Sequence, residues 1–498
     1  MKKLSKYQIE ILDMFWVFLI SIFIRLNSLA PNSLWQDDSY VALVIKATSF
    51  EEFKLTAGHH PGFSALLLSL YKFFGFSELL FQIPSFVLGI LLPGIGYLAL
   101  KRHNFSRRFS FTFALILASS PTLVLVSSRV KPYSTETFIA VLYLYFLSNE
   151  KTLKNDIYIF FFSIIALLIS YYSLFVIGAY YLSLANFRQY KFHENRNLYF
   201  GFGVFIFFLL SYKLYLNSLP LISAIMVHPH VFYDWPIRDV FKGVFAGFNS
   251  MTMATFIPVY LLKWTSYDIF SETSRFYQFF YSGISLTVLF NSKKIFKHNY
   301  KLGIFVVSPF IITVIGALLG YLVWGKGVPE QYRMLSSLIP CYAIWILFSA
   351  KEIFLKLKLD YFFTVSIFIF LFMISIFYIK FNPYFLYPQQ DYRAAIQLIE
   401  KDIDGSNQNW LIKTTDGTSP GAVLYDGSVN VEFGPGLIFS SSKSKSELVD
   451  LSGSEYQDIK MVYTIYINKD YDLSYLGYKK EKLNYSSLGN LFVSKWKK

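Results

Sequence analysis

Apolar runs of roughly 17 to 25 residues recur from the N-terminus to about residue 380, and this recurrence constrains the fold more than any other feature. A run of this length matches a helix that crosses about 30 Å of hydrocarbon. Composition points the same way, because 54% of the 498 residues are hydrophobic and only 16% are charged, against about 25% charged in soluble domains. We therefore predict an all-α polytopic membrane protein and exclude an ordinary water-soluble enzyme.

The runs predict about eleven transmembrane helices. They lie near residues 10–29, 79–100, 109–127, 134–148, 157–170, 174–187, 198–217, 275–290, 302–323, 334–350 and 361–380. The fifth and sixth runs meet at Ser170-Tyr171-Tyr172-Ser173 and could instead form one long tilted helix. No small-residue cleavage pattern follows the first run, so we interpret it as an uncleaved span rather than a signal peptide.

Lysine and arginine fall mostly in the short gaps between these runs, although the formal net charge is +14. The gaps 101–108 and 291–301 hold four basic residues each and no acidic residue, which is typical of cytoplasmic loops. This pattern predicts a multi-pass cell-membrane protein with a cytoplasmic N-terminus, and it argues against nucleic acid as a partner. The single cysteine, Cys341, excludes an intramolecular disulfide.

Residues 382–498 differ in character, since charged residues, Gly, Ser and Asn become frequent and no run is long enough to span a membrane. Asp391 to Asp402 has the apolar spacing of a helix, and Trp410–Lys413, Met461–Ile467 and Leu491–Val493 are typical of strands. We predict two domains, a transmembrane domain over 1–381 and a small extracytoplasmic α/β domain over 382–498.

The long loop 30–78 contains an acidic pair, Asp37-Asp38, and the segment His59-His60-Pro61-Gly62. Ser49 to Glu52 fits a capping box, so a short helix is predicted near Glu51, and Ala65 to Phe74 is apolar but too short to cross. We interpret these stretches as helices on the membrane surface.

The order of these features resembles the GT-C membrane glycosyltransferases that use polyprenyl-phosphate sugars, including protein mannosyltransferases, aminoarabinose transferases and related bacterial enzymes. Asp37-Asp38 and His60-Pro61 match the start of that pattern, and Ser128 to Tyr133 is similar to its Ser-Arg-x-x-Arg-Pro-Tyr segment. Tyr332-Arg333 with Pro340 is similar to its Arg-Tyr-x-x-Pro stretch. Two departures are Asp-Asp in place of the common Asp-Glu and Gly62 in place of a second proline.

The resemblance implies an inverting glycosyltransferase, of the hexosyl- or pentosyltransferase class, that moves a sugar from a polyprenyl-phosphate donor to a glycolipid, polysaccharide or protein in the cell envelope. Such a reaction needs a carboxylate beside the acceptor hydroxyl, and we assign that role to Asp37 or Asp38. It also needs cations at the departing phosphate, which Arg129, Lys131 and Arg333 supply.

A divalent metal, Mg²⁺ or Mn²⁺, is a further candidate partner of the phosphate, with Asp38 as a ligand. His59, His60 and Glu136 are the nearest other candidates for a metal or acceptor site. The residues alone leave structural roles open. Asp38 could cap a helix over 39–47, the two histidines could be exposed loop residues, and the three cations could snorkel to the interface.

The alternative function is a transporter or flippase of lipid-linked sugars. Transporters usually place ionisable groups near the middle of the membrane, whereas the interiors of the predicted spans are nearly free of them. A membrane anchor that presents the C-terminal domain would not need eleven spans. The sequence therefore favours the enzyme.

Overall fold

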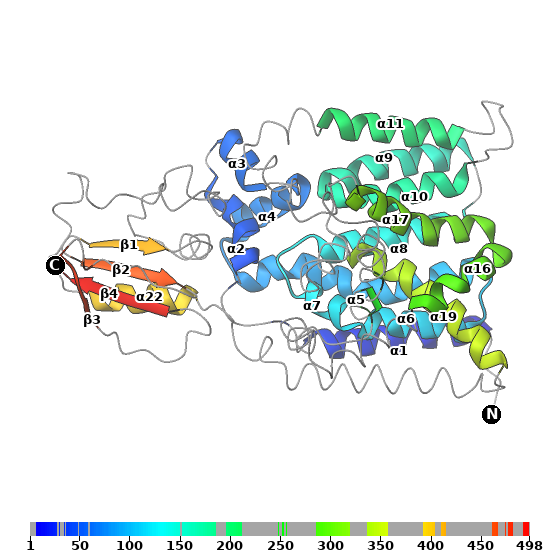
Figure 1. The fold of residues 1–498 in the computed structure, drawn as a ribbon, viewed down its shortest axis with the longest axis horizontal. Helices are drawn as coiled ribbons and strands as arrows, with labels where there is room; N and C mark the ends of the chain where they lie inside the picture. The colour runs from blue at the N-terminus through cyan, green and yellow to red at the C-terminus, as the bar shows by residue number, and fades with distance from the viewer. Residues whose placement is uncertain are drawn as a thin grey trace. The chain divides into compact units, whose positions relative to one another are not determined.

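Figure 1 shows the fold of the chain in a computed structural model. The structure describes residues 6–26, 29, 34, 36–47, 49–57, 60–149, 152–185, 196–211, 248, 251–252, 255, 285–318, 336–356, 392–403, 410–414, 461–466, 474, 477–481 and 492–497. Two compact units are present. Unit 1 comprises Met1–Leu29, Gly58–Phe63 and Gln82–Asn382, and unit 2 comprises Ala30–Ala57, Ser64–Phe81 and Pro383–Lys498. The division into domains 1–381 and 382–498 stays a prediction.

Unit 1 is a bundle of helices (Figure 1). Its elements are α1 (Lys6–Leu26), α5 (Glu78–Arg102, from Gln82 onward), α6 (Arg107–Ser119), α7 (Pro121–Ser127), α8 (Tyr133–Phe146), α9 (Leu153–Ile169), η2 (Tyr171–Ser173), α10 (Leu174–Leu184), α11 (Arg196–Ser211), α16 (Ser292–His298), α17 (Tyr300–Leu318), η5 (Ser336–Leu338) and α19 (Ile339–Lys356). These helices coincide with most of the predicted runs, whereas the run 361–380 and residues 275–284 of the run 275–290 lie outside the described residues.

In the described part of the chain, one helix, α5, has the length and apolar content to cross a membrane, and counting the bent pair of α6 and α7 as one span would make two. Several other helices of unit 1 expose large apolar side chains, among them Phe15, Phe161, Phe202 and Ile311, each more than half exposed. Exposed apolar surface on this scale is typical of helices that face lipid. The number of crossings stays a prediction.

The predicted single run 109–127 is wrong in one respect, because the chain bends by 54° between α6 and α7. Ser120 lies at the bend with φ −56° and ψ 120°, outside the helical region. The cause is Pro121, whose ring disfavours helical backbone at the residue before it.

The alternative of one long helix over 157–187 is also wrong. Helix α9 ends at Ile169 and α10 begins at Leu174, and Ser170 between them is extended, with φ −155° and ψ 126°. The Ser170 hydroxyl accepts a hydrogen bond from the backbone N–H of Tyr172 at 3.3 Å, which stabilises the start of η2.

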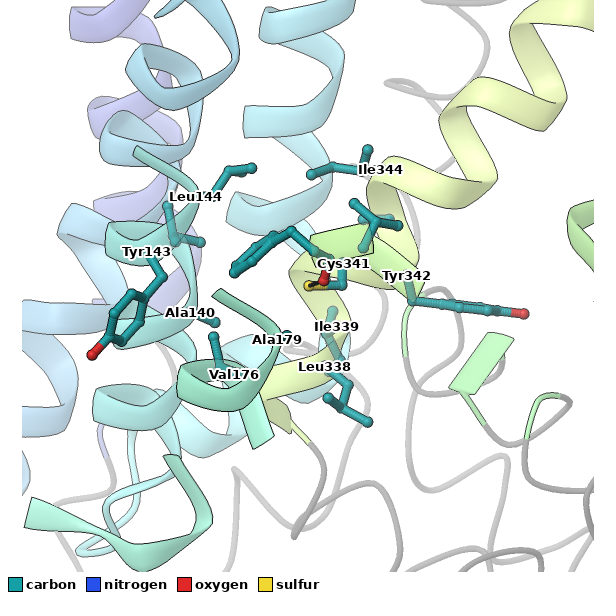
Figure 2. Packing of buried hydrophobic residues seen from close by; sticks show 14 of the residues in the cluster. Ala140, Tyr143, Leu144, Val176, Ala179, Leu338, Ile339, Cys341, Tyr342 and Ile344 are labelled. Carbon is teal, nitrogen blue, oxygen red and sulfur yellow. Dashed lines mark hydrogen bonds between the residues drawn. The ribbon is translucent and has the colours of Figure 1, made fainter. Parts of the chain in front are cut away.

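The core of unit 1 lies where α8, α10 and α19 meet (Figure 2). Side chains of Ala140, Leu144, Val176 and Ile339 pack together there, and Cys341 is 1% exposed. Buried hydroxyl groups in the bundle bond to each other, as at Ser163, whose Oγ lies 2.6 Å from the Tyr143 hydroxyl oxygen. This agrees with the rule that polar groups away from water find partners.

Unit 2 combines short helices with a small sheet. Its elements are α2 (Gln36–Ala42), η1 (Leu43–Lys46), α3 (Phe50–Ala57), α4 (Pro61–Phe74, from Ser64 onward), α22 (Tyr392–Ile403), β1 (Trp410–Thr414), β2 (Met461–Tyr466), β3 (Lys479–Glu481) and β4 (Phe492–Lys497). The sheet order is β1-β2-β4-β3, with β1 parallel to β2 and the other pairs antiparallel. The predicted helix and all three predicted strands are confirmed.

Helix α22 buries Ala395, Ile396 and Ile399, an apolar stripe with helical spacing. One of the two hydrogen bonds of the predicted capping box before α3 is confirmed. The backbone N–H of Glu52 donates to the Ser49 hydroxyl at 3.2 Å.

Candidate functional site

The acidic pair lies within α2, because the helix begins at Gln36, one residue before Asp37. The prediction that Asp38 caps a helix over 39–47 is therefore wrong, since both carboxylates belong to the first turn rather than to the capping position. Asp38 is 2% exposed, whereas the side chain of Asp37 lies outside the described residues. A carboxylate this buried is costly unless it is bonded, which favours a specific role over that of a surface acid.

His60 precedes α4 directly, and Pro61 is the first residue of that helix. This confirms that His60-Pro61 opens a helix, and it follows from the fixed φ and missing N–H of proline. His60 is half-buried, with its ring centroid 6.1 Å from that of Tyr172. The expectation of an exposed loop residue is therefore wrong for His60, and His59 lies outside the described residues.

Gly62 explains one departure from the family pattern. A Cβ atom at this position would lie 2.8 Å from the Leu168 carbonyl oxygen, closer than real Cβ contacts. The backbone at the start of α4 therefore approaches the backbone at the end of α9 so closely that a residue with a Cβ does not fit without movement. Glycine allows this approach.

Glu136 lies in the first turn of α8 and is fully buried. The Ser170 hydroxyl donates to Glu136 Oε1 at 2.5 Å. The second oxygen, Oε2, is also buried and has no hydrogen-bond partner among the described residues. Burial and the neighbouring Glu136 raise the pKa of Tyr172, in the turn between α9 and α10, to about 12, so its hydroxyl stays protonated. The structure thus brings His60, Tyr172, Ser170 and Glu136 to one place in unit 1.

Arg129 and Lys131 lie on either side of the fully buried Val130, in the turn between α7 and α8. Both are half-buried, as expected for side chains that either snorkel or bind a ligand. The Ser85 hydroxyl donates to the Lys131 carbonyl oxygen at 2.9 Å, which ties this turn to α5.

Arg333 lies outside the described residues. Three residues later, the Ser336 hydroxyl donates to the Tyr133 carbonyl oxygen at 3.3 Å, so the start of η5 lies against the start of α8.

Sequence reasoning missed Arg25, a cation inside the first predicted span. Its guanidinium is fully buried and donates to the carbonyl oxygens of Ala118 at 2.7 Å and Leu117 at 3.1 Å. These carbonyls end α6, where a cation satisfies unpaired acceptors and the helix dipole. An arginine in an apolar run was the available signal, and here it stabilises the bend before Pro121.

The described residues contain no group of three or more His, Cys, Asp or Glu side chains that could hold a metal ion. The side chain of Asp37 and all of His59 lie outside that search. No such group includes Asp38, the residue expected to bind Mg²⁺ or Mn²⁺.

No protein-family model and no curated protein sequence matches the chain. Among solved structures, ArnT from Cupriavidus metallidurans in the apo state aligns with a TM-score of 0.55 and 11% identity over 97% of this chain and 98% of that chain. The same protein bound to undecaprenyl phosphate aligns with a TM-score of 0.57 and 10% identity over 99% and 98%.

A weaker match, with a TM-score of 0.44 and 12% identity, is to the oligosaccharyltransferase of Archaeoglobus fulgidus. ArnT is an aminoarabinose transferase with the GT-C fold. The likeness to ArnT runs almost from end to end of both chains, and it confirms the predicted GT-C fold for this chain.

Proposed function

We propose that this protein is an inverting membrane glycosyltransferase that moves a sugar from a polyprenyl-phosphate donor to a glycolipid, polysaccharide or protein. The observation that supports this most is the full-length likeness to ArnT, which has been crystallised with undecaprenyl phosphate. The exposed apolar helix surfaces of unit 1 suit an enzyme whose donor stays in the bilayer.

In the proposed reaction, the acceptor hydroxyl oxygen attacks the anomeric carbon of the sugar. The bond from that carbon to the phosphate oxygen breaks, and polyprenyl phosphate leaves with the bonding electrons. Asp37 or Asp38 takes the proton of the acceptor hydroxyl. Burial of Asp38 supports this role, because a desolvated carboxylate interacts strongly with a nearby proton donor.

Arg129, Lys131 and Arg333 are proposed to bind the phosphate. Their positive charge would stabilise the negative charge that gathers on the leaving group. A divalent metal, if it binds, would supply the same charge stabilisation. The donor headgroup is proposed to lie at the outer membrane surface, with the N-terminus in the cytoplasm and residues 382–498 outside.

The test uses cells that lack this protein and carry either the wild-type gene or a variant. Mass spectrometry of envelope glycans and lipids should show a missing monosaccharide and an accumulated polyprenyl-phosphate sugar in the deletion strain. Asp37→Asn or Asp38→Asn should reproduce the deletion phenotype, with transfer reduced about a hundredfold or more, within the range for loss of a general base. Arg129→Gln combined with Lys131→Gln should weaken undecaprenyl phosphate binding to the purified protein.

Two results would contradict the proposal. Full sugar transfer in both aspartate variants would contradict the assignment of Asp37 or Asp38 as the general base. An unchanged set of envelope glycans in the deletion strain would contradict the proposed transfer reaction.

A further inference from the structure

Two polar oxygens on the neighbouring elements α8 and η2 are buried without a partner among the described residues. They are Glu136 Oε2 on α8 and Ser173 Oγ in η2. Both side chains are fully buried. Buried polar atoms in proteins nearly always have a hydrogen-bond partner, because leaving one unmet costs about 1–3 kcal/mol.

Ser170 links the two residues through hydrogen bonds. Ser170 binds Glu136 Oε1 through its hydroxyl, and the Ser170 carbonyl oxygen accepts from the backbone N–H of Ser173 at 3.1 Å. The turn η2 also packs against α8, the helix that carries Glu136. Ser173 and Glu136 therefore lie in neighbouring elements, and the Tyr172 ring next to Ser173 lies near His60.

Glu136 Oε2 and Ser173 Oγ limit which chemical groups could bind to them. A carboxylate oxygen accepts hydrogen bonds and repels anions, so the site does not suit a phosphate. A serine hydroxyl both donates and accepts. Neighbouring hydroxyl groups of a sugar, each a donor and an acceptor, match both atoms.

We propose that Glu136 and Ser173 bind hydroxyl groups of the sugar carried by the donor, and so take part in choosing which sugar is transferred. This inference rests on the proposed function and extends it, because it separates the sugar-binding residues from the phosphate-binding residues Arg129 and Lys131.

The test measures binding to the purified full-length protein with five probes. These are undecaprenyl phosphate and its conjugates with glucose, mannose, galactose and arabinose. The ratio of the Kd for undecaprenyl phosphate to the Kd for the best conjugate gives the contribution of the sugar. In wild type we expect at least one conjugate to bind more tightly than undecaprenyl phosphate.

Glu136→Gln should lower this ratio about tenfold, the loss expected when one buried hydrogen bond is removed. Ser173→Ala should lower it about threefold. Neither should change the Kd for undecaprenyl phosphate by more than about twofold. Ser163→Ala is the matched control, because it also removes a buried hydroxyl of the same bundle, but one that is bonded to Tyr143. Its ratio should stay at the wild-type value.

An unchanged ratio in folded Glu136→Gln protein would overturn the inference, as would four conjugates that all bind wild type no better than undecaprenyl phosphate. Failure of wild type to bind undecaprenyl phosphate at all would instead contradict the proposed function, and the inference with it. Thermal unfolding of each variant separates loss of binding from loss of folding.

Discussion

The two ends of the helix bundle in unit 1 differ in how their buried carboxylates are bonded. At one end, Asp13 on α1 accepts from Arg107 Nε at 2.6 Å and Nη2 at 2.7 Å, and from the Tyr97 hydroxyl at 3.0 Å. The hydrogen bonds that Arg107 donates to Asp13 raise the pKa of Arg107, so its guanidinium stays charged. Arg102 likewise donates to Asn149 at 2.7 Å.

At the other end, Glu136 is fully buried, with one oxygen bonded to Ser170 and the other without a partner among the described residues. The pairing of Asp13 with Arg107 joins α1 to α6 and needs no ligand to complete it. A buried carboxylate oxygen without a hydrogen-bond partner lowers the stability of the fold. We propose that the end with Asp13 serves structure and that the end with Glu136 serves binding.

The largest expected effect is at Arg25, a buried charged residue to which we assign a structural role. Its substitution tests whether burial of a charged residue is by itself evidence of a binding site. Arg25→Met removes the donors to the carbonyls of Leu117 and Ala118, and we expect a loss of about 3 kcal/mol in the free energy of unfolding. A thiol-reactive dye reports unfolding directly, because Cys341 is the single cysteine and is 1% exposed. Arg25→Lys, which keeps the charge, should lose less. A wild-type unfolding temperature in Arg25→Met would show that the bend at Ser120 does not depend on Arg25.

Gly62→Ala tests the close approach at the binding end. The added Cβ would meet the Leu168 carbonyl oxygen at 2.8 Å, so the backbone must shift, at a cost of about 2 kcal/mol. Transfer per folded molecule should also fall, because the shift moves His60 away from Tyr172. Gly178→Ala in α10 is the control, since its Cβ would meet Ile312 at an ordinary 3.6 Å. Equal behaviour of the two variants would contradict the role given to Gly62.

Asp13→Asn tests the paired end. It breaks a two-bond ion pair whose carboxylate is 7% exposed and whose arginine is 55% exposed, so we expect a loss of about 1–2 kcal/mol in stability. Transfer per folded molecule should stay at the wild-type level. Urea unfolding combined with a transfer assay separates the two effects. Activity that falls further than the folded fraction would show that this end also contributes to the reaction.

The smallest effect is expected at Asp402 in unit 2, a paired carboxylate like Asp13. Burial alone would raise its pKa, but hydrogen bonds from Lys495, at 2.7 Å, and from Tyr463 outweigh this, and its pKa is lowered. Its contribution to stability is therefore present above its unfolded pKa of about 4 and is lost as the pH falls through the lower folded value.

At neutral pH, Asp402→Asn should cost about 1 kcal/mol. Hydrogen exchange of β2 and β4 peptides in the full chain measures this by comparing variant and wild type at each pH. The difference should shrink as the pH falls below 4. A difference that stays constant down to pH 2 would contradict the assignment.

Local signals in the sequence predicted most elements. The apolar stripe of Asp391 to Asp402 predicted α22, and Ser49 and Pro61 marked the starts of α3 and α4, because caps and prolines act within a few residues. Strand β3 was missed, since its residues Lys479 to Glu481 are all exposed and show no alternation. The bend before Pro121 was missed because the apolar run continues through it.

By itself, the sequence determined the helical class, the position of most helices, the α/β character of the C-terminal segment and the resemblance to the GT-C enzymes, since hydrophobic period and motif order are written along the chain. Three contacts could be known only from the three-dimensional fold: Glu136 bonds to Ser170, 34 positions away, Arg25 of α1 bonds to the end of α6, and Gly62 lies against Leu168. These contacts join residues far apart in the chain, and packing selects them in a way that no local pattern records.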